Sequence, residues 1–550
     1  MKNSQIIENY WNTTDDYEDY PNQIKKIFQI IYISEERKFN EWIKQISLKY
    51  KSDIDWWIVL PVSRNPYVSE LYKTVCIIKT LKILKSKKIL PKKILVSSDH
   101  IKKIVNESFD IKIISKKKSI YYKFFFLKNL KAAILFLLNY ILVNLLSKKN
   151  KIKNELLTLI DTFIISEKYQ ETSFYGVLYQ KYLKKKKNYY FVPTLIYKSF
   201  FYYIKKILKL KPTKYLFKEH YLKPKDIIYC LNHICRKNKF LVSYKNYYGI
   251  NLDPLIHKEL KYNSDYFSIF QSLANYLFTK RLKENKIRLK KVINWYENQP
   301  IDKAWNYGFK KFYSETDIIG YQGMLNAPMY HCLSPTENEV KLNLTPKKII
   351  VINKSLIQER SKFTKIKEIF QIGPALRFNE IFKSKIPQKK KNIITIFLEG
   401  INEKKDLKML NKFIQIAKKI PEVHFQVKEH PRMILNKLKV DVPANLKFKY
   451  NKFSILAKNS AISACIGATS TVIESLAYGC FLIIPSNSGY EKIILKNLNI
   501  PNQFFKICSN EKEITDTIKA YLKRPKKIKS NLLKKHLFEK ITNENIKVFT

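Results

Sequence analysis

The sequence has little glycine and few acidic residues, and both shortages constrain its structure. Only 10 of the 550 residues are glycine, and none lies before Gly176. Where glycine is so rare, the remaining glycines are expected at tight turns and close ligand contacts that exclude a side chain. Lys and Arg number 103 against 46 Asp and Glu, a net charge of +57. This charge favours polyanionic partners, although abundant Lys, Asn, Ile and Tyr are also typical of an AT-rich genome.

Paired cysteines, a secretory signal and metal-binding motifs are also missing. The seven cysteines are an odd number without paired spacing, which indicates a reducing compartment. Cys230 and Cys235 flank His233 at a spacing that matches no standard zinc pattern, and no DxD-like motif appears where a nucleotide diphosphate would need it, so we expect no metal ion. Residues 1–19 are polar and acidic, unlike a signal peptide. We therefore expect a cytoplasmic protein, or one on the cytoplasmic face of a membrane.

Long hydrophobic runs are limited to one stretch. Residues 132–146 are nearly all apolar, but about 20 apolar residues are needed to span a bilayer. A buried or interfacial helix is favoured, and membrane contact by residues 124–146 is left open. Residues 200–211 mix aromatic, aliphatic and lysine side chains, as in a helix on an anionic membrane surface or an ordinary amphipathic helix. We expect a peripheral protein on the inner face of the cytoplasmic membrane.

Hydrophobic patterning predicts an α/β chain in two halves. In the first half it predicts a βαβ unit (a strand at 56–60, a helix at 70–87 and a strand at 93–97), strands at 157–160, 189–192, 291–296 and 317–321, and a helix at 262–285. The second half begins near a strand at 349–352. It continues with strands at 392–398, 423–427, 461–466 and 481–484 and a helix at 404–419. Each later strand ends in a polar or glycine-containing loop, where ligands of such sheets bind.

The most informative segment runs from residue 466 to 485. It is typical of a strand end, a glycine turn, a hydroxyl-rich helix start and a second buried strand; the turn and helix start contain Gly467, Thr469, Ser470 and Thr471. Free N–H groups and the positive dipole end make such a helix start an anion site, usually for phosphate. A capping box of Thr471 and Glu474 without a ligand is the alternative. Glu474 could also hold a ribose by accepting two hydroxyl hydrogen bonds.

Polar residues also follow the strand at 423–427. His430 and Pro431 stand there with Lys428 beside them. Because the carboxyl ends of parallel strands share one edge, Lys428, His430 and the helix start could converge on a phosphate. A histidine bound only by local backbone is the alternative.

Two strand ends in the first half carry further polar groups. Glu297 follows the strand at 291–296, and Gln322 follows the strand at 317–321. A carboxylate at this edge could act as the general base toward an acceptor hydroxyl. Asp99 and Glu219 compete for this role, and a salt bridge from Glu297 to a lysine needs no function at all.

These motifs, in this order, resemble the two-Rossmann-domain (GT-B) glycosyltransferases of bacterial surface polysaccharides. The matching runs are residues 61–65, 295–299, 320–323, 373–378, 429–431 and 470–474. A narrower resemblance is to bacterial sialyltransferases, which hold the phosphate of a CMP-sugar with a His-Pro and a Ser-Ser/Thr motif, matched here by His430-Pro431 and Ser470-Thr471. Their acidic motif is matched only in part by Glu399-Gly400, in the second half, so the base role is not transferred to Glu399. Similar His-Pro elements occur in glycerophosphate polymerases that use CDP-glycerol.

The resemblance implies two Rossmann-like domains facing across a cleft. Residues 1–50 would form an N-terminal extension, 51–370 the acceptor domain with helical insertions, 371–525 the nucleotide-sugar domain, and 526–550 a basic tail that packs across both domains. The implied site residues are Glu297 and His430 for catalysis; Lys428, His430, Pro431, Gly467, Thr469, Ser470, Thr471 and Glu474 for the nucleotide sugar; and Ser63, Arg64, Asn65, Asn298, Gln299 and Gln322 for the acceptor.

The implied activity is sugar transfer in capsule, O-antigen or lipopolysaccharide biosynthesis, without a metal ion or other cofactor. A CMP-nonulosonate is the favoured donor, a saccharide or lipid-linked saccharide the acceptor, and an anionic membrane surface a further partner. A CDP-glycerol-type polyol-phosphate transferase is one alternative. A non-catalytic nucleic-acid-binding protein is the other, but the sequence lacks RNA-binding aromatic motifs, zinc-finger spacing and a basic region with heptads, so no nucleic acid is expected.

Overall fold

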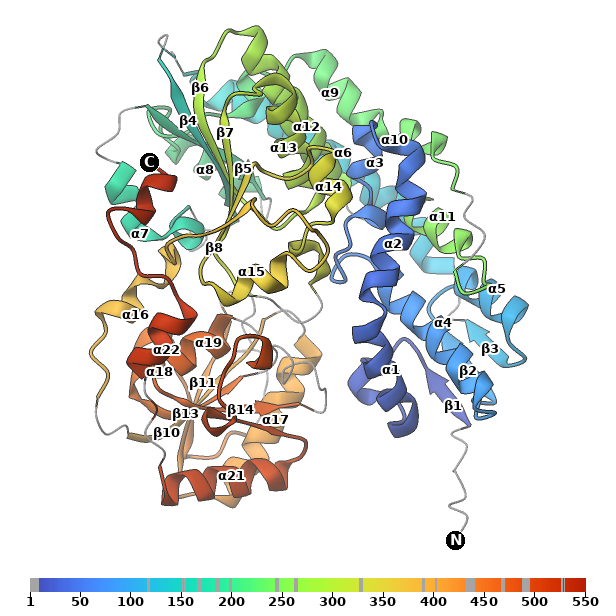
Figure 1. Ribbon diagram of the computed structural model, residues 1–550, viewed down its shortest axis with the longest axis vertical. Helices are drawn as coiled ribbons and strands as arrows, with labels where there is room; N and C mark the ends of the chain where they lie inside the picture. The colour runs from blue at the N-terminus through green and yellow to red at the C-terminus, as the bar shows by residue number, and fades with distance from the viewer. Residues whose placement is uncertain are drawn as a thin grey trace.

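In the computed structural model (Figure 1), the described residues form three sheets whose strands are all parallel. The structure describes residues 9–550 apart from 116–118, 151, 153–154, 166–170, 184–187, 197–199, 243–246, 262–265, 326–329, 388–390, 401–402, 431–440, 466–469, 487–494, 526–527 and 529. The predicted site residues Pro431, Gly467 and Thr469 therefore lie outside the described residues.

Residues 9–115 form a small lobe around a three-stranded sheet of order β1-β2-β3. Its strands are β1 (Tyr10–Asn12), β2 (Lys93–Val96) and β3 (Lys112–Ser115), and its longer helices are α1 (Asn22–Ser34), α2 (Glu36–Ser47), α4 (Leu71–Ser86) and α5 (Asp99–Ser108). The segment expected as an extension packs Trp11, Phe28 and Trp42 into the core of this lobe. It is therefore an integral part of the lobe.

The strand predicted at 56–60 is wrong. The chain there forms the short helix α3 (Ile54–Trp57) and the 3-10 turn η3 (Leu60–Val62). Asp53 caps α3 by accepting the N–H of Asp55 at 2.9 Å, and Pro61 has no N–H to donate to a neighbouring strand. A short run that is apolar on every side fits a helix and a strand equally, which is why the pattern misled. The βαβ unit of this lobe is instead β2–α5–β3.

The first six-stranded sheet has the order β5-β4-β6-β7-β8-β9. Its strands are β4 (Leu157–Ile164), β5 (Tyr189–Leu195), β6 (Leu289–Trp295), β7 (Asp317–Gln322), β8 (Lys348–Val351) and β9 (Phe370–Ile372). The helices of this region are α6 (Ser119–Leu146), α7 (Glu171–Leu183), α8 (Phe200–Lys209), α9 (Pro224–Leu231), α10 (His233–Arg236), α11 (Asp253–Lys261), α12 (Tyr266–Glu284), α13 (Pro300–Phe312), α14 (Glu337–Lys341) and α15 (Ser355–Arg360). The strand at 349–352 was expected to open the second half, but β8 pairs with β7 and belongs here.

The second six-stranded sheet has the order β12-β11-β10-β13-β14-β15, which in chain order is the Rossmann arrangement 3-2-1-4-5-6. Its strands are β10 (Lys391–Phe397), β11 (His424–Lys428), β12 (Leu446–Phe448), β13 (Ser460–Cys465), β14 (Phe481–Pro485) and β15 (Phe505–Cys508). The helices are α16 (Asn379–Lys383), α17 (Glu403–Lys419), α18 (Phe453–Asn459), α19 (Ser470–Ala477), α21 (Glu511–Lys523) and α22 (Ser530–Leu537). The predicted α/β fold with two Rossmann-like domains is confirmed.

Helix α17 shows why this half could be predicted from the sequence. Leu410, Phe413 and Ala417 recur every three or four residues and are fully buried. Acidic residues occupy its first turn and lysines its last turn, which complements the helix dipole. Local preference and burial therefore agree along the whole helix.

The C-terminal segment passes from the second sheet to the first (Figure 1). Helix α22 packs on α19. At the end of α22, the carbonyl of Leu537 accepts a hydrogen bond from the Nδ2 of Asn353 at 2.9 Å. Further on, the ring of Phe549 lies 5.2 Å from the ring of Tyr321 in β7. The tail thus contacts both Rossmann-like domains.

Candidate active site at the facing edges of the two sheets

The second sheet reverses its strand order between β10 and β13, and ligands of Rossmann-like sheets bind at the carboxyl edge of this point. Gly400 follows β10 with a φ of +68°, a conformation that favours glycine. A carbon added to Gly400 as a side chain would lie 2.3 Å from the Cβ of His430, which follows β11. Only glycine fits, and His430 packs directly against this loop.

Asp406 in the first turn of α17 holds the same loop in place. Its carboxylate accepts the N–H of Glu399 at 2.8 Å and that of Gly400 at 2.7 Å. Asp406 is buried, and burial raises its pKa even though both hydrogen bonds favour the charged form. Sequence reasoning missed Asp406, because an acidic residue in the first turn of a helix is too common to single out.

Helix α19 supplies the third part of this edge. It begins at Ser470, so Thr471 lies inside the helix and does not occupy the N-cap position that the alternative, a capping box of Thr471 and Glu474, requires. All three side chains are half-buried at the start of the helix. Burial raises the pKa of Glu474 to about 7, against the opposing charge of Arg377. Lys428, the last residue of β11, and His430 are also half-buried.

The first sheet reverses its order between β4 and β6, and a pocket of about 220 Å³ lies at the carboxyl ends of these strands. Aromatic side chains, including Phe163, Phe174 and Trp295, form much of its wall. Glu297 and Gln299 provide polar groups in the same wall. The pocket therefore combines apolar surface with a few polar groups, as small-molecule sites do.

Glu297 is fixed within this pocket by two hydrogen bonds. The Nε1 of Trp295 donates to one carboxylate oxygen at 2.8 Å, and the hydroxyl of Tyr330 donates to the other at 2.7 Å. Each oxygen has a second lone pair that remains available for another donor. Glu297 is half-buried and lines the pocket, so it can accept the proton of an acceptor hydroxyl.

The other candidate bases lie elsewhere. Glu219 is buried against α6, where the Nδ2 of Asn139 donates to it at 2.7 Å. Asp99 begins α5 in the small lobe. Neither contributes to the pocket, so the geometry favours Glu297.

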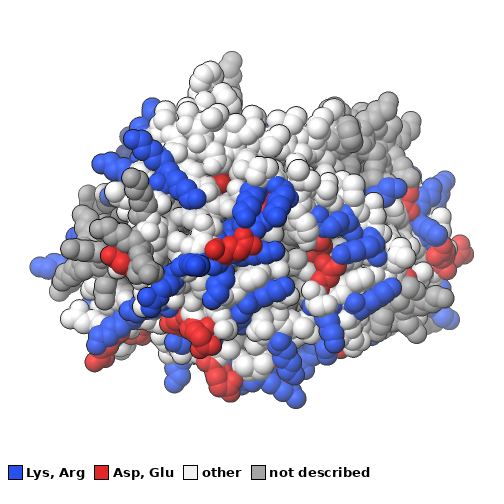
Figure 2. Space-filling model, turned by 90° about the horizontal axis from the view of Figure 1, so that it is seen from above, with Lys and Arg blue, Asp and Glu red and all other residues white. Residues whose placement is uncertain are grey.

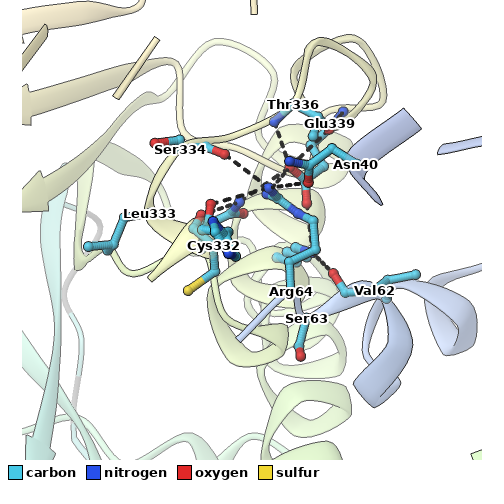
Figure 3. Close-up of polar contacts among 12 residues, drawn as sticks. Asn40, Val62, Ser63, Arg64, Cys332, Leu333, Ser334, Thr336 and Glu339 are labelled. Carbon is cyan, nitrogen blue, oxygen red and sulfur yellow. Dashed lines mark hydrogen bonds and ion pairs between the residues drawn. The ribbon is translucent and has the colours of Figure 1, made fainter. Parts of the chain in front are cut away.

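Arg64 was expected to contact the acceptor but belongs to a buried network (Figure 3). Its guanidinium donates to Glu339 at 2.6 Å, and the ammonium of Lys303 lies 2.7 Å from the other oxygen of the same carboxylate. Burial alone would raise the pKa of Glu339, but the charges of Arg64 and Lys303 hold it at about 2. The network joins the small lobe to the first sheet and fixes the loop after β6, since Asn298 also donates to Glu339 at 3.3 Å.

Most of the residues predicted for the acceptor are likewise internal. The buried ones are Ser63, Arg64, Asn65, Asn298 and Gln322, none of which is more than 6% exposed. Their groups bind the chain itself: Asn65 donates to Gln299 at 3.0 Å, and Gln322 donates to the carbonyl of Leu333 at 2.9 Å. We therefore reassign these residues to the scaffold of the pocket. Gln299 is half-buried and lines it.

Arg377 connects the two edges. It lies in the 3-10 turn η7 (Leu376–Phe378), between β9 and β10, and is exposed. Its guanidinium carbon is 5.4 Å from the ring centre of Trp295, whose indole binds Glu297. Its charge also acts on Glu474 of α19. Arg377 lay inside a run that matched the resembled family, but sequence reasoning did not select it.

Tyr67 makes a second connection between the edges. Its ring centre is 5.6 Å from that of Tyr330, whose hydroxyl binds Glu297. Burial raises the pKa of Tyr67, and the charge of Glu399 in the loop after β10 adds to this effect. The carboxyl edges of the two sheets therefore face each other, with a fixed carboxylate on one side and a helix start beside His430 on the other.

Within the described part of the chain, no group of three or more His, Cys, Asp or Glu side chains is placed to hold a metal ion. The groups that could bind a phosphate here are Lys428, His430, Arg377 and the start of α19.

No protein-family model matches the sequence, and no curated protein matches it. Among solved structures the chain is similar to TarM, with a TM-score of 0.42 and 12% identity over 72% of this chain and 100% of that one. It is also similar to CalG4, the calicheamicin glycosyltransferase, with a TM-score of 0.41 and 10% identity over 70% and 93% of the two chains. UDP-GlcNAc 2-epimerase from Neisseria meningitidis bound to UDP-GlcNAc gives a TM-score of 0.37 and 10% identity over 70% and 95%. Likeness of this degree shows a shared fold and assigns no activity.

Proposed function

We propose that the protein is a glycosyltransferase of surface carbohydrate biosynthesis, acting in the synthesis of capsule, O-antigen or lipopolysaccharide. It would transfer a sugar from a nucleotide sugar to a saccharide or lipid-linked saccharide acceptor without a metal ion. One observation carries the proposal: the pocket that holds Glu297 faces the reversal point of a Rossmann sheet, and Arg377 lies between them. The two substrates of a transfer reaction need such a pair of adjoining sites.

On the donor side, the phosphate would lie against the first turn of α19, near His430 and Lys428. Positive charge and backbone N–H groups at this point stabilise the negative charge that develops on the leaving nucleotide. Glu474 would accept hydrogen bonds from the ribose hydroxyls. These donors favour its charged form, so nucleotide binding would lower its raised pKa.

On the acceptor side, Glu297 would act as the general base. The acceptor oxygen forms a bond to the anomeric carbon as the bond from that carbon to the phosphate oxygen breaks. The hydroxyl proton passes to Glu297, and the nucleotide leaves with the electron pair of the broken bond. The hydrogen bonds from Trp295 and Tyr330 keep the carboxylate in one orientation for this step.

A CMP-nonulosonate is the donor that we favour. The support is the order and position of His430 after β11 and of Ser470 and Thr471 at the start of α19. A polyol-phosphate transferase that uses CDP-glycerol would need the same phosphate contacts and would also release CMP, so the group that is transferred decides between them. A nucleic-acid-binding role has no comparable support, because Figure 2 shows Lys and Arg spread across the face with Asp and Glu among them.

A thermal-shift panel of CMP, CDP, UDP and GDP tests the proposal on the wild type, His430→Ala and Glu297→Gln. Ligand at a hundredfold excess over its Kd stabilises a folded protein by about 2.7 kcal/mol, a shift of several degrees. We expect this shift with CMP for the wild type and Glu297→Gln, and its loss in His430→Ala. CMP is also the product of transfer from CDP-glycerol, so a shift with CDP that exceeds the shift with CMP would favour the polyol-phosphate transferase. Binding of only UDP or GDP would overturn the CMP assignment, and no shift with any nucleotide would overturn the proposed function.

A further inference from the structure

The long helix α6 exposes a stripe of large aliphatic side chains. Its members are Leu127, Leu130, Ile134, Leu137, Ile141 and Leu145, with exposures from 39% to 74%. They recur every three or four residues and therefore lie on one face of the helix. At 1.5 Å per residue the stripe is about 27 Å long. Continuous apolar surface of this extent marks a face that another molecule covers.

The opposite face of α6 is packed against the protein. Phe136, Asn139 and Val143 are buried, and Asn139 donates to the buried Glu219 at 2.7 Å. Among the described residues, one helical segment, Leu127–Leu146, is long and apolar enough to cross a bilayer, with a mean hydropathy of 1.7. Crossing would strip this face of its protein partners and carry Asn139 into hydrocarbon. The geometry suits a helix that lies along a membrane surface instead.

Helix α8 extends the same kind of surface. It packs against α6, and its buried Ile207 belongs to the same core as Val143 of α6. Outward it presents Phe201 and Leu208, which are 83% and 63% exposed, with the exposed Lys205 and Lys209 on the same helix. Exposed apolar side chains with neighbouring lysines are typical of helices that lie in a lipid interface.

All charged residues in the sequence stretches that contain these two helices are lysines. No Asp or Glu occurs from residue 111 to 154 or from 172 to 218, the stretches that contain α6 and α8. Exposed lysines stand at both ends of the stripe, namely Lys128, Lys131, Lys148 and Lys149. Lysines that flank an apolar face complement anionic headgroups above an acyl layer.

We propose that the surface formed by α6 and α8 docks the protein on an anionic lipid bilayer, with α6 lying in the boundary between headgroups and acyl chains. A second copy of the chain is a poorer occupant. Two α6 stripes paired about a twofold axis would place Lys128 and Lys131 of one copy against Lys148 and Lys149 of the other, and like charges repel. The inference rests on this surface and is independent of the proposed sugar transfer.

Vesicle flotation of the full-length protein tests the docking surface. The vesicles contain phosphatidylcholine alone or phosphatidylcholine with about one third phosphatidylglycerol. We expect the wild type to float with the anionic vesicles, less so at high salt, and much less with the neutral ones. The double variant Leu137→Glu/Ile141→Glu should bind at least about tenfold more weakly, because it places two charges in the apolar stripe. Both positions are exposed, so the variant should keep the wild-type circular dichroism spectrum.

Ile30→Glu is the matched control, since Ile30 is 68% exposed on α1, outside the proposed surface. It should float like the wild type. A wild type that stays unbound with both vesicles would overturn the inference, as would equal loss in the control. A wild-type dimer that Leu137→Glu/Ile141→Glu converts to monomer, without vesicle binding, would assign the stripe to a second copy. Resistance of vesicle-bound protein to alkaline extraction would indicate a spanning helix and would also overturn it.

Discussion

The carboxyl edges of the two Rossmann-like sheets carry polar residues at equivalent positions but use them differently. At the first edge, Arg64, Lys303 and Glu339 neutralise one another in the interior, and Glu297 is the charged group held toward the pocket. At the second edge, His430 and the residues that open α19 remain half-buried beside the loop after β10. A fully buried polar residue at a strand end serves as scaffold, and a half-buried one keeps part of its side chain accessible. The first edge fixes one carboxylate in a pocket, and the second keeps several polar side chains partly exposed.

Replacing Glu297 by Gln should have the largest effect and tests whether the first edge has a chemical role. We expect kcat for sugar transfer to fall by about a hundred- to ten-thousandfold, because the amide cannot accept the acceptor proton. Trp295 can still donate to the amide oxygen, so the fold should persist. Nucleotide release from the sugar donor measures the rate, and Asp99→Asn serves as the control that keeps it. Activity within tenfold of the wild type would place the base elsewhere.

Replacing Glu339 by Gln tests the scaffold assignment of the same edge. The variant leaves two buried cations without their anion, and the free energy of unfolding should fall by about 3–5 kcal/mol. The matched control is Glu337→Gln on the same helix, where the exposed pair with Lys341 is screened by solvent and should contribute little to stability. Urea denaturation measures both. Equal effects in the two variants would contradict a buried network.

The same network has a defined pH dependence. The pKa of Glu339 in the folded protein is about 2, whereas an unfolded glutamate titrates at about 4.3. Its contribution to stability is therefore complete above about pH 4.5 and is lost as the pH falls toward 2. Glu339→Gln should flatten this part of the wild-type stability profile.

Gly400→Ala tests whether the loop after β10 must stay close to His430, and Gly249→Ala is its control. Both glycines have positive φ, +68° and +79°, so each alanine should lower stability by about 1 kcal/mol. Only at Gly400 does the added carbon meet His430, whereas the space around Gly249 is open. The shift with CMP should therefore disappear in Gly400→Ala and survive in Gly249→Ala. If the shift with CMP disappeared in both variants, backbone strain alone would explain its loss and the contact with His430 would not.

Glu474→Gln should have the smallest effect, and a pH series reveals it. The raised pKa of about 7 means that folding takes up a proton between about pH 4.5 and 7. As the pH rises through this interval, the free energy of unfolding of the wild type should therefore fall by about 1–2 kcal/mol relative to that of the glutamine variant. Above about pH 7 the two stability profiles should run parallel. Urea titrations at about pH 5, 6, 7 and 8 measure the difference in the free energy of unfolding between the two proteins. Parallel profiles throughout would show that Glu474 is not a buried acid.

The second half of the fold could be predicted because its signals are local. Strands such as β13 and β14 are short apolar runs bounded by polar or glycine residues, and the rare glycine Gly400 does mark a close contact. Local sequence patterns gave wrong predictions at two points in the first half. The run at 56–60 has no periodicity, and the sheet to which β8 belongs depends on pairing that no local pattern specifies.

The candidate site divides in the same way. His430 and Ser470 could be selected because strand ends in a parallel sheet share an edge. Arg64 was misread because its partner Glu339 is 275 residues away, and only the folded chain brings them together. Arg377 had no recognisable spacing to either Trp295 or Glu474. Its position became meaningful only when the two sheets were seen to face each other.

The paired crossings between the two Rossmann-like domains restrict how those domains can move. The chain passes from β9 to β10 and returns in the segment after α22, and the two passages are bound together. The N–H of Ala375 donates to the carbonyl of Glu539 at 2.8 Å, and the N–H of Glu539 donates to that of Ile352 at 2.8 Å. The first bond joins the two passages, and the second ties the returning one to the end of β8. Two bonded passages should resist twisting more than one would, so a nucleotide held by the second domain would approach Glu297 mainly by bending at this connection.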